Sequence, residues 1–258
     1  MGLQPPYVSF SRLAKFSLCG EAYRREYVLG EETPSGLHAA AGTAIHEAIR
    51  TWEIDGFSSD LLALAKAQLR DVEGLEALPV LGKQDLKWWF TTGLPERVEN
   101  YRTFRAIEFD RGMRWYNEDP ERFLEHEVQV QLDPELPKLH GIIDQVGVDS
   151  RGRLFIRDVK TGNPKRWHAL QVQFYALAWN TRYPHAPASH AALLYLKGKK
   201  PVQRIVPITL TRDHLLAMLR AMVSVNDYPI QGPFTEACGL CAFKPSCPWG
   251  QVGERSIL

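Results

Sequence analysis

Apolar residues recur at the spacing of a helix through the first half of the chain. Within residues 42–53, the side chains of Ile45, Ala48, Ile49 and Trp52 stand at positions i, i+3, i+4 and i+7. This pattern predicts an amphipathic helix with one apolar face. Similar signals predict further helices over residues 9–19, 60–72, 83–90 and 95–116.

The period of the pattern changes after about residue 121. Leu124, Val128, Val130 and Leu132 alternate with polar residues, as expected of a strand with one buried face. Further strands are predicted over residues 139–148, 154–160, 191–196 and 202–208. A turn over residues 149–152 separates the first two of these, because Asp and Gly favour tight turns.

Helices are also predicted among and after these strands. Asn163 followed by Pro164 is typical of a helix start, and that helix would reach about Asn180. Thr211 predicts the cap of a last helix that ends near Val225. Strands interleaved with helices indicate an α/β core covered by helices.

Two neighbouring predicted strands carry charged residues on faces that are otherwise apolar. Because strand side chains alternate, Asp144 shares the face of Ile142, and Asp158 and Lys160 share the face of Ile156. Burying an unpaired carboxylate is costly, so a cation should neutralise this pair. Hard oxygen ligands favour Mg²⁺ or Mn²⁺, and Lys160 could polarise a water molecule or hold a phosphate oxygen.

The four cysteines gather at the two ends of the chain. Cys19 lies near the start, and Cys238, Cys241 and Cys247 lie in the segment CGLCAFKPSC. Four thiolates suit either an iron–sulfur cluster or a structural zinc ion. Either centre would join the beginning of the chain to its end.

Overall composition excludes little. Hydrophobic residues make up 45% and charged residues 24% of the chain, and the net charge is +1. A phosphate-binding surface would therefore depend on clustered basic residues rather than on bulk charge. No apolar run is long enough to span a bilayer, and no secretory signal is present. We expect a cytoplasmic protein with no membrane contact, in which thiols stay reduced.

Several motifs, taken together and in order, resemble the PD-(D/E)XK nucleases, most closely their RecB-type exonuclease branch. GIID and, one hairpin later, DVKTG resemble the two motifs that carry the acidic residues and the lysine. GTAIHEAI resembles the helical motif with a metal-binding histidine, and QVQFY resembles the Q-x-x-x-Y motif. The opening segment VSFSRLAKFSLC and the terminal C-x2-C-x5-C-P resemble the iron–sulfur variant, found in AddB-type nuclease domains and CRISPR-adaptation exonucleases.

This resemblance implies a fold and a set of site residues. The fold is a restriction-endonuclease-like α/β core, a central mixed sheet flanked by helices. One nuclease domain would span residues 1–258: a mainly helical portion (1–120), the core (121–210), and a last helix with the cysteine cluster (211–258). His46, Asp144, Asp158 and the Val159 carbonyl would bind Mg²⁺ or Mn²⁺, and Lys160 would assist catalysis. Cys19, Cys238, Cys241 and Cys247 would bind a [4Fe–4S] cluster.

The resemblance also implies a DNA exonuclease of recombination, repair or CRISPR adaptation, with protein partners from one of these systems. Gln171 and Tyr175 stand four residues apart, so both would face the site from one side of a helix and contact DNA. Lys165 opens the same helix, and Arg24 and Arg25 lie between tyrosines. Interleaved basic and aromatic residues suit single-stranded DNA, so we expect a preference for single-stranded ends.

Three alternatives remain open at this stage. The chain could be a DNA-binding module that recruits partners without cleaving DNA. It could be a redox sensor that loses its DNA affinity when an iron–sulfur cluster is oxidised. The four cysteines could hold zinc instead of iron, which an absorption spectrum would distinguish.

Overall fold

The computed structural model describes residues 7–32, 36–80, 84–224, 241 and 243–247. Contacts within the chain divide it into two compact units. The terminal unit consists of residues 1–34, 130–140 and 211–258, and the central unit consists of residues 35–129 and 141–210.

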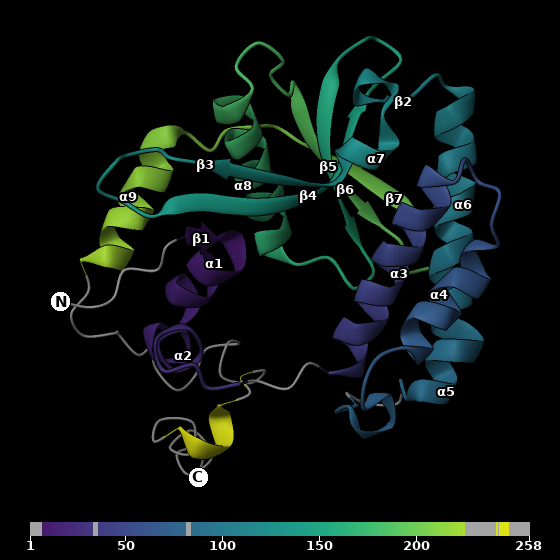
Figure 1. Ribbon diagram of the computed structural model, residues 1–258, viewed down its shortest axis with the longest axis horizontal. Helices are drawn as coiled ribbons and strands as arrows, with labels where there is room; N and C mark the ends of the chain where they lie inside the picture. Colours follow the sequence, from purple (N-terminus) through teal and green to yellow (C-terminus); the bar gives the residue numbers. More distant parts are fainter. Residues whose placement is uncertain (1–6, 33–35, 81–83, 225–240, 242, 248–258) are drawn as a thin grey trace. The chain divides into compact units, whose positions relative to one another are not determined.

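A mixed β-sheet forms the frame of the central unit (Figure 1). Strand β5 (Leu154–Lys160) pairs antiparallel with β4 (Lys138–Val148) and parallel with β6 (His190–Tyr195). Strand β7 (Val202–Val206) continues the sheet antiparallel to β6. The short strand β2 (Arg114–Trp115) and strand β3 (Leu124–Val130) both pair with β4.

Helices cover both faces of this sheet. Helix α8 (Arg166–Arg182) connects β5 to β6, as a parallel pair of strands requires. On the other face lie α3 (Leu37–Ile54), α4 (Leu61–Arg70) and α6 (Leu94–Asp110) (Figure 1). Helical turns at α5 (Leu86–Trp88) and residues 89–93 lead directly into α6, and α7 (Pro120–Phe123) precedes β3.

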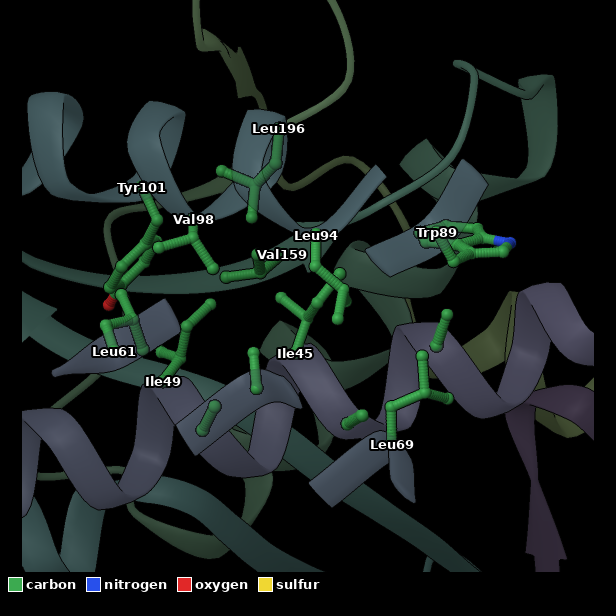
Figure 2. Close-up of a cluster of buried hydrophobic side chains, with 14 of the residues drawn as sticks. Ile45, Ile49, Leu61, Leu69, Trp89, Leu94, Val98, Tyr101, Val159 and Leu196 are labelled. Atoms are coloured by element: carbon green, nitrogen blue, oxygen red, sulfur yellow. The ribbon is translucent and has the colours of Figure 1, made fainter. Parts of the chain in front are cut away.

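A large core cluster lies between these three helices and the sheet (Figure 2). Ile45 and Ile49 of α3 meet Val98 of α6 and Leu196, which follows β6. Val159 of β5 joins the cluster from the strand that also carries Asp158. The apolar stripe predicted at residues 45–52 is therefore the buried face of α3. Its packing fixes α3 against β5, the strand that carries Asp158.

The terminal unit is built from both ends of the chain. Strand β1 (Tyr7–Ser9) runs parallel to residues 138–140 of β4, and α1 (Phe10–Leu18) packs against α9 (Arg212–Val223). After Cys19 come α2 (Gly20–Tyr23) and a π-helical turn at residues 24–28. A short 3₁₀ turn occupies residues 244–246.

The α/β fold with a mixed sheet flanked by helices is confirmed, and so is the helix cap at Thr211. Ser9 and Asp60 cap α1 and α4 with their side chains. Two boundaries were wrong. The helix predicted to reach residue 116 ends at Asp110, because Gly112 turns the chain with φ of +76°. The helix predicted to begin at Asn163 begins at Arg166, with Lys165 in the cap position. Union of both units into one nuclease domain stays a prediction.

No helix in the described ranges is long and apolar enough to cross a membrane.

Candidate active site

Asp144 and Asp158 stand where the pairing of β4 with β5 ends. The antiparallel register pairs Gln145 with Arg157, and one further step sets Asp144 opposite Asp158. The carboxylate of Asp144 accepts a hydrogen bond from the backbone N–H of Val159, with Oδ2 2.7 Å from the nitrogen. The predicted proximity of the two carboxylates on adjacent strands therefore follows from the register of the sheet.

His46 reaches the same place from helix α3. Its Nδ1 lies 3.6 Å from Oδ2 of Asp144. Gly42, one turn earlier on α3, lets the helix approach the chain after β5, since a Cβ there would lie 3.2 Å from the Thr161 hydroxyl. The side chains of His46 and Asp144 are 26% and 18% exposed, so water and small ions can reach them.

Lys160 is held by groups from both β5 and α8. Its ammonium nitrogen lies 2.7 Å from Oδ2 of Asp158 and donates a hydrogen bond of 2.7 Å to Oε1 of Gln171. The Gln171 amide in turn donates to the Tyr175 hydroxyl at 3.0 Å. Gly141 of β4 leaves room for the Tyr175 ring, because a Cβ there would lie 2.9 Å from two ring carbons. Gln171 and Tyr175 are thus bonded to each other and, through Gln171, to the lysine; their contact with DNA stays a prediction.

Burial disfavours the charged forms of the ionisable side chains at this site. It raises the pKa of Asp144 to about 6, against the attraction of Lys160. Burial together with the negative charge of Asp144 raises the pKa of Asp158 to about 7. Burial lowers the pKa of His46, so its imidazole is neutral at pH 7. Two carboxylates that resist ionisation side by side, next to a neutral imidazole, match the donor set of a divalent cation.

A cleft of about 310 Å³ opens over these groups. It includes every central-unit residue that the sequence placed in the site. Its lining consists of His46, Asp144, Asp158, Val159, Lys160, Thr161, Gly162, Asn163, Lys165, His168, Gln171 and Tyr175. At its rim, the ammonium of Lys165 lies 4.9 Å from the centre of the Trp167 ring, and that ring is 38% exposed.

The side chains that could bind a metal lie close together in pairs rather than as a group of three. Within the described ranges, no three His, Cys, Asp or Glu side chains are grouped closely enough to hold a metal ion. One oxygen nonetheless fits a cation: Oδ2 of Asp158 is buried and has no hydrogen bond of acceptable geometry among the described residues. Its 2.7 Å contact with Lys160 is ionic. The residues present therefore suit a hard divalent cation.

Two supporting residues were missed in the sequence. Arg97 of α6 is 2% exposed and donates from Nε to the Thr161 carbonyl at 2.7 Å, which pins the chain directly after Lys160. Glu125 has a positive φ of 50° and acts electrostatically on both His46 and Asp144. A buried arginine has no periodic signature on a mostly polar helix face, and strand alternation could not distinguish Glu125 from its neighbours.

The remaining predicted residues lie in the terminal unit, apart from Cys238, which lies outside the described residues. Arg24 donates two hydrogen bonds to the Glu21 carboxylate, and Arg25 donates two to Glu31. Tyr23 is 3% exposed, so its ring cannot offer a stacking surface. Contact of the two arginines with DNA stays a prediction.

Three of the four cysteines can be placed. Cys19, Cys241 and Cys247 are half-buried. Arg25 links their two segments, because it donates to the Ser246 hydroxyl at 2.9 Å and its guanidinium lies 4.5 Å from the centre of the Phe243 ring. The residues after Cys19 therefore contact the residues before Cys247.

The chain belongs to the PD-(D/E)XK nuclease superfamily, since the model of that family matches residues 7–248. The carboxylates of Asp144 and Asp158 and the ammonium of Lys160 stand within this match. No curated protein matches the chain.

Two solved structures illustrate the similarity in fold. One, from Eubacterium rectale, is named as a candidate exonuclease; it shares 15% identity, covers 91% of this chain and 87% of its own, and has a TM-score of 0.52. The other, SSO0001, shares 12% identity over 95% of this chain and 87% of its own, with a TM-score of 0.47. At such identity, the first supports the fold alone.

Proposed function

We propose that this chain is a metal-dependent deoxyribonuclease that degrades DNA from its ends. Membership of the nuclease superfamily supplies the class of reaction. The observation that carries the proposal is the cluster of Asp144, Asp158 and Lys160 at the floor of one cleft, with the His46 imidazole 3.6 Å from Asp144. Phosphodiester hydrolysis needs charge stabilisation and an oriented water, which such a cluster can provide.

His46, Asp144, Asp158 and the Val159 carbonyl would hold Mg²⁺ or Mn²⁺ in the proposed enzyme. Such a cation lowers the pKa of a bound water and offsets charge on the scissile phosphate. Asp144 and Asp158 must be ionised to serve as ligands. The raised pKa of each carboxyl therefore makes cation binding release protons below about pH 7.

In the proposed enzyme, Lys160 acts as an electrostatic catalyst. The Gln171 amide oxygen and the Asp158 carboxylate each lie 2.7 Å from its ammonium, so the charge is fixed at the cleft floor. A fixed ammonium can orient the attacking water and stabilise negative charge as it develops on the phosphate. Gln171, through its second bond to Tyr175, keeps that ammonium in place.

Single-stranded DNA is the proposed substrate. Support comes from the rim of the cleft, where Lys165 can neutralise a phosphate and the exposed ring of Trp167 can stack on a base. His168, which lines the cleft beside Trp167, is buried and has a pKa lowered to about 4 by burial and by Lys160 and Lys165. It therefore remains neutral and adds no competing cation.

A [4Fe–4S] cluster on Cys19, Cys238, Cys241 and Cys247 is part of the proposal. The spacing of the cysteines supports it, and so do the contacts of Arg25 with Phe243 and Ser246 within the terminal unit. Anaerobically purified protein should be brown, with iron and sulfide at about four per chain. One zinc ion in a colourless protein would replace the cluster with a structural zinc site.

The resemblance to the RecB-type branch supplies the biological setting of this proposal: recombination, repair or CRISPR adaptation, with partner proteins from that setting. The name of the similar E. rectale structure, a candidate exonuclease, agrees with action from ends. Support from the chain itself is the combination of His46 on its helix with Gln171 and Tyr175 beside the lysine.

The deciding experiment compares labelled linear and circular single-stranded DNA of one sequence, with Mg²⁺, Mn²⁺ or EDTA. We expect progressive loss of linear DNA with either cation and no loss of circular DNA. Linear duplex should be degraded more slowly. Equal degradation of the circle would make the enzyme an endonuclease. DNA binding without cleavage under every condition would favour a silent binding module, and binding that depends on cluster oxidation would favour a redox sensor.

A further inference from the structure

A chain of buried polar side chains lies behind the strands that form the cleft. Its members are Glu53 of α3, Tyr101 of α6, Gln145 of β4 and Arg157 of β5, and none is more than 2% exposed. Polar and charged groups are rarely placed so deep without partners, because the loss of water is costly. All four lie in the central unit.

Hydrogen bonds join these four side chains in sequence. The Tyr101 hydroxyl donates to Oε1 of Glu53 at 2.7 Å, and the Gln145 amide donates to the Tyr101 oxygen at 2.7 Å. Nε of Arg157 then donates to Oε1 of Gln145 at 2.5 Å. The chain is therefore continuous from a helix, through a second helix, to two neighbouring strands.

Both ends of the chain are anchored. Arg105 donates to both oxygens of the Glu53 carboxylate. At the other end, Nη1 of Arg157 donates to Glu108 at 2.7 Å and to Gln203 at 3.1 Å. Two arginines thus face two glutamates, so charge within the network is balanced. Nη2 of Arg157 is the one buried nitrogen of these side chains without a hydrogen bond among the described residues. A buried network bonded at its other positions resists displacement of any one member.

The elements joined by this network are those that carry the proposed metal ligands. Gln145 directly follows Asp144, and Arg157 directly precedes Asp158. Because strand side chains alternate, each network residue points away from its acidic neighbour. Glu53 follows His46 by seven residues, about two helical turns along α3. Three ligand-bearing elements are thereby bonded to one another. On β4 and β5 the bonds lie on the side remote from the ligands, and on α3 they lie about two turns along the helix from His46.

Placement of these elements matters because the donors come from separate parts of the chain. His46 approaches Asp144 at 3.6 Å, and the described donors do not form a closed group of three. Whether His46, Asp144 and Asp158 can bind one cation together therefore depends on how α3, β4 and β5 are held relative to one another. Side-chain rotation alone cannot correct an element that has shifted.

We propose that the Glu53–Tyr101–Gln145–Arg157 chain sets the spacing at which His46, Asp144 and Asp158 meet a divalent cation. Tyr101 and Gln145 are positioning residues in this scheme, since neither touches the cation or DNA. The inference rests on the proposed metal-dependent function. It predicts that the network governs metal affinity, whereas a role limited to folding would affect stability alone.

The test replaces Tyr101 with Phe, which keeps the ring and removes the hydroxyl between Glu53 and Gln145. Tyr183→Phe is the matched control, because its hydroxyl bonds His126 of β3 at 3.0 Å, also in the central unit but with neither residue on α3, β4 or β5. Mn²⁺ affinity is measured by electron paramagnetic resonance without DNA, and cleavage is measured against Mn²⁺ concentration. Melting temperatures are recorded for all proteins.

We expect Tyr101→Phe to raise the Mn²⁺ dissociation constant about tenfold, as loss of groups that orient ligands does elsewhere. Its cleavage rate should recover at saturating Mn²⁺. Tyr183→Phe should bind Mn²⁺ as the wild type does, even with a similar drop in melting temperature. Equal Mn²⁺ affinity in Tyr101→Phe and the wild type would overturn the proposal.

A second variant covers the case in which Tyr101→Phe does not fold. Glu108→Gln keeps the shape of the anchor of Arg157 and removes one charge, and it should raise the dissociation constant at least twofold. An unchanged value would also overturn the proposal. If the wild type neither binds Mn²⁺ nor cleaves DNA, the proposed function itself fails. If the wild type does both and the variants match it, only the positioning role fails.

Discussion

The two faces of the β4–β5 pair differ in how their buried charges are neutralised. On the cleft face, Asp144 and Asp158 lie side by side, and burial raises the pKa of both. On the rear face, Arg157 is completely buried and bonded to Gln145, Glu108 and Gln203. The rear face therefore balances its charges with its own side chains. The cleft face leaves negative charge for an external cation to offset, as functional sites commonly do.

The contrast explains why neighbouring residues on one strand should respond differently to substitution. A change on the rear face should mainly alter folding, through the loss of buried partners. A change on the cleft face should mainly alter catalysis, because relief of carboxylate repulsion spares the fold.

Arg157→Leu should lower the free energy of unfolding by about 3–5 kcal/mol, because it leaves the buried partners of Arg157 unpaired. Arg153→Leu is the control, since Arg153 pairs with Asp149 in an exposed turn and should cost under about 1 kcal/mol. Urea unfolding followed by circular dichroism measures both. Similar losses in the two variants would remove the distinction between the rear face and ordinary surface pairs.

Asp158→Asn should lower the rate of DNA cleavage at least about a hundredfold, equivalent to about 2.7 kcal/mol of activation free energy. The fold should remain intact, because the substitution removes a carboxylate that burial and Asp144 already disfavour. Asp149→Asn, in the turn between the same strands, should cleave at nearly the wild-type rate. Initial cleavage rates are measured on end-labelled single-stranded DNA. A near-normal rate for Asp158→Asn would show that the Asp158 carboxylate has no catalytic role.

Stability in EDTA should fall as the pH rises from about 4 to 7. The folded-state pKa of Asp158 is raised to about 7 and that of Asp144 to about 6, from an ordinary value of 3.8. The folded protein therefore keeps protons that the unfolded chain has lost, so each unit of rising pH favours unfolding across this window. Thermal unfolding should show a shallower dependence for Asp158→Asn than for the wild type, by about 1.4 kcal/mol per pH unit, because the folded variant keeps one proton fewer. Parallel curves for the two proteins would show that Asp158 has an ordinary pKa.

Gly141→Ala should lower the cleavage rate about threefold to tenfold, which corresponds to about 1 kcal/mol. Its Cβ would crowd the Tyr175 ring at 2.9 Å and so disturb the contact from Gln171 to Lys160. Introduced together with Tyr175→Leu, it should cause little further loss, because the crowded ring is gone. A full additional loss in the double variant would place the effect of Gly141 elsewhere.

The sequence by itself determined the order of the elements and the chemistry of the cleft floor. The stripe from Ile45 to Trp52 marked the buried face of α3, because helical spacing is a local property of the chain. Alternation along residues 142–148 and 154–160 placed Asp144 and Asp158 on neighbouring strands of one hairpin. Lys160 was predicted from the strand face that it shares with Asp158, whereas His46, Gln171 and Tyr175 were predicted from the resemblance of their motifs to the PD-(D/E)XK nucleases; all four line the cleft.

Only the tertiary structure decided which distant side chains meet. Ile142, expected on an apolar face with Asp144, is 50% exposed. The partnership of Glu53 with Tyr101 and Gln145, and of Arg97 with the Thr161 carbonyl, joins residues far apart in the chain. Such contacts leave no periodic signal, since a buried polar residue looks like a surface residue until its partner is known. The pairing of each buried charge is therefore a property of the assembled fold.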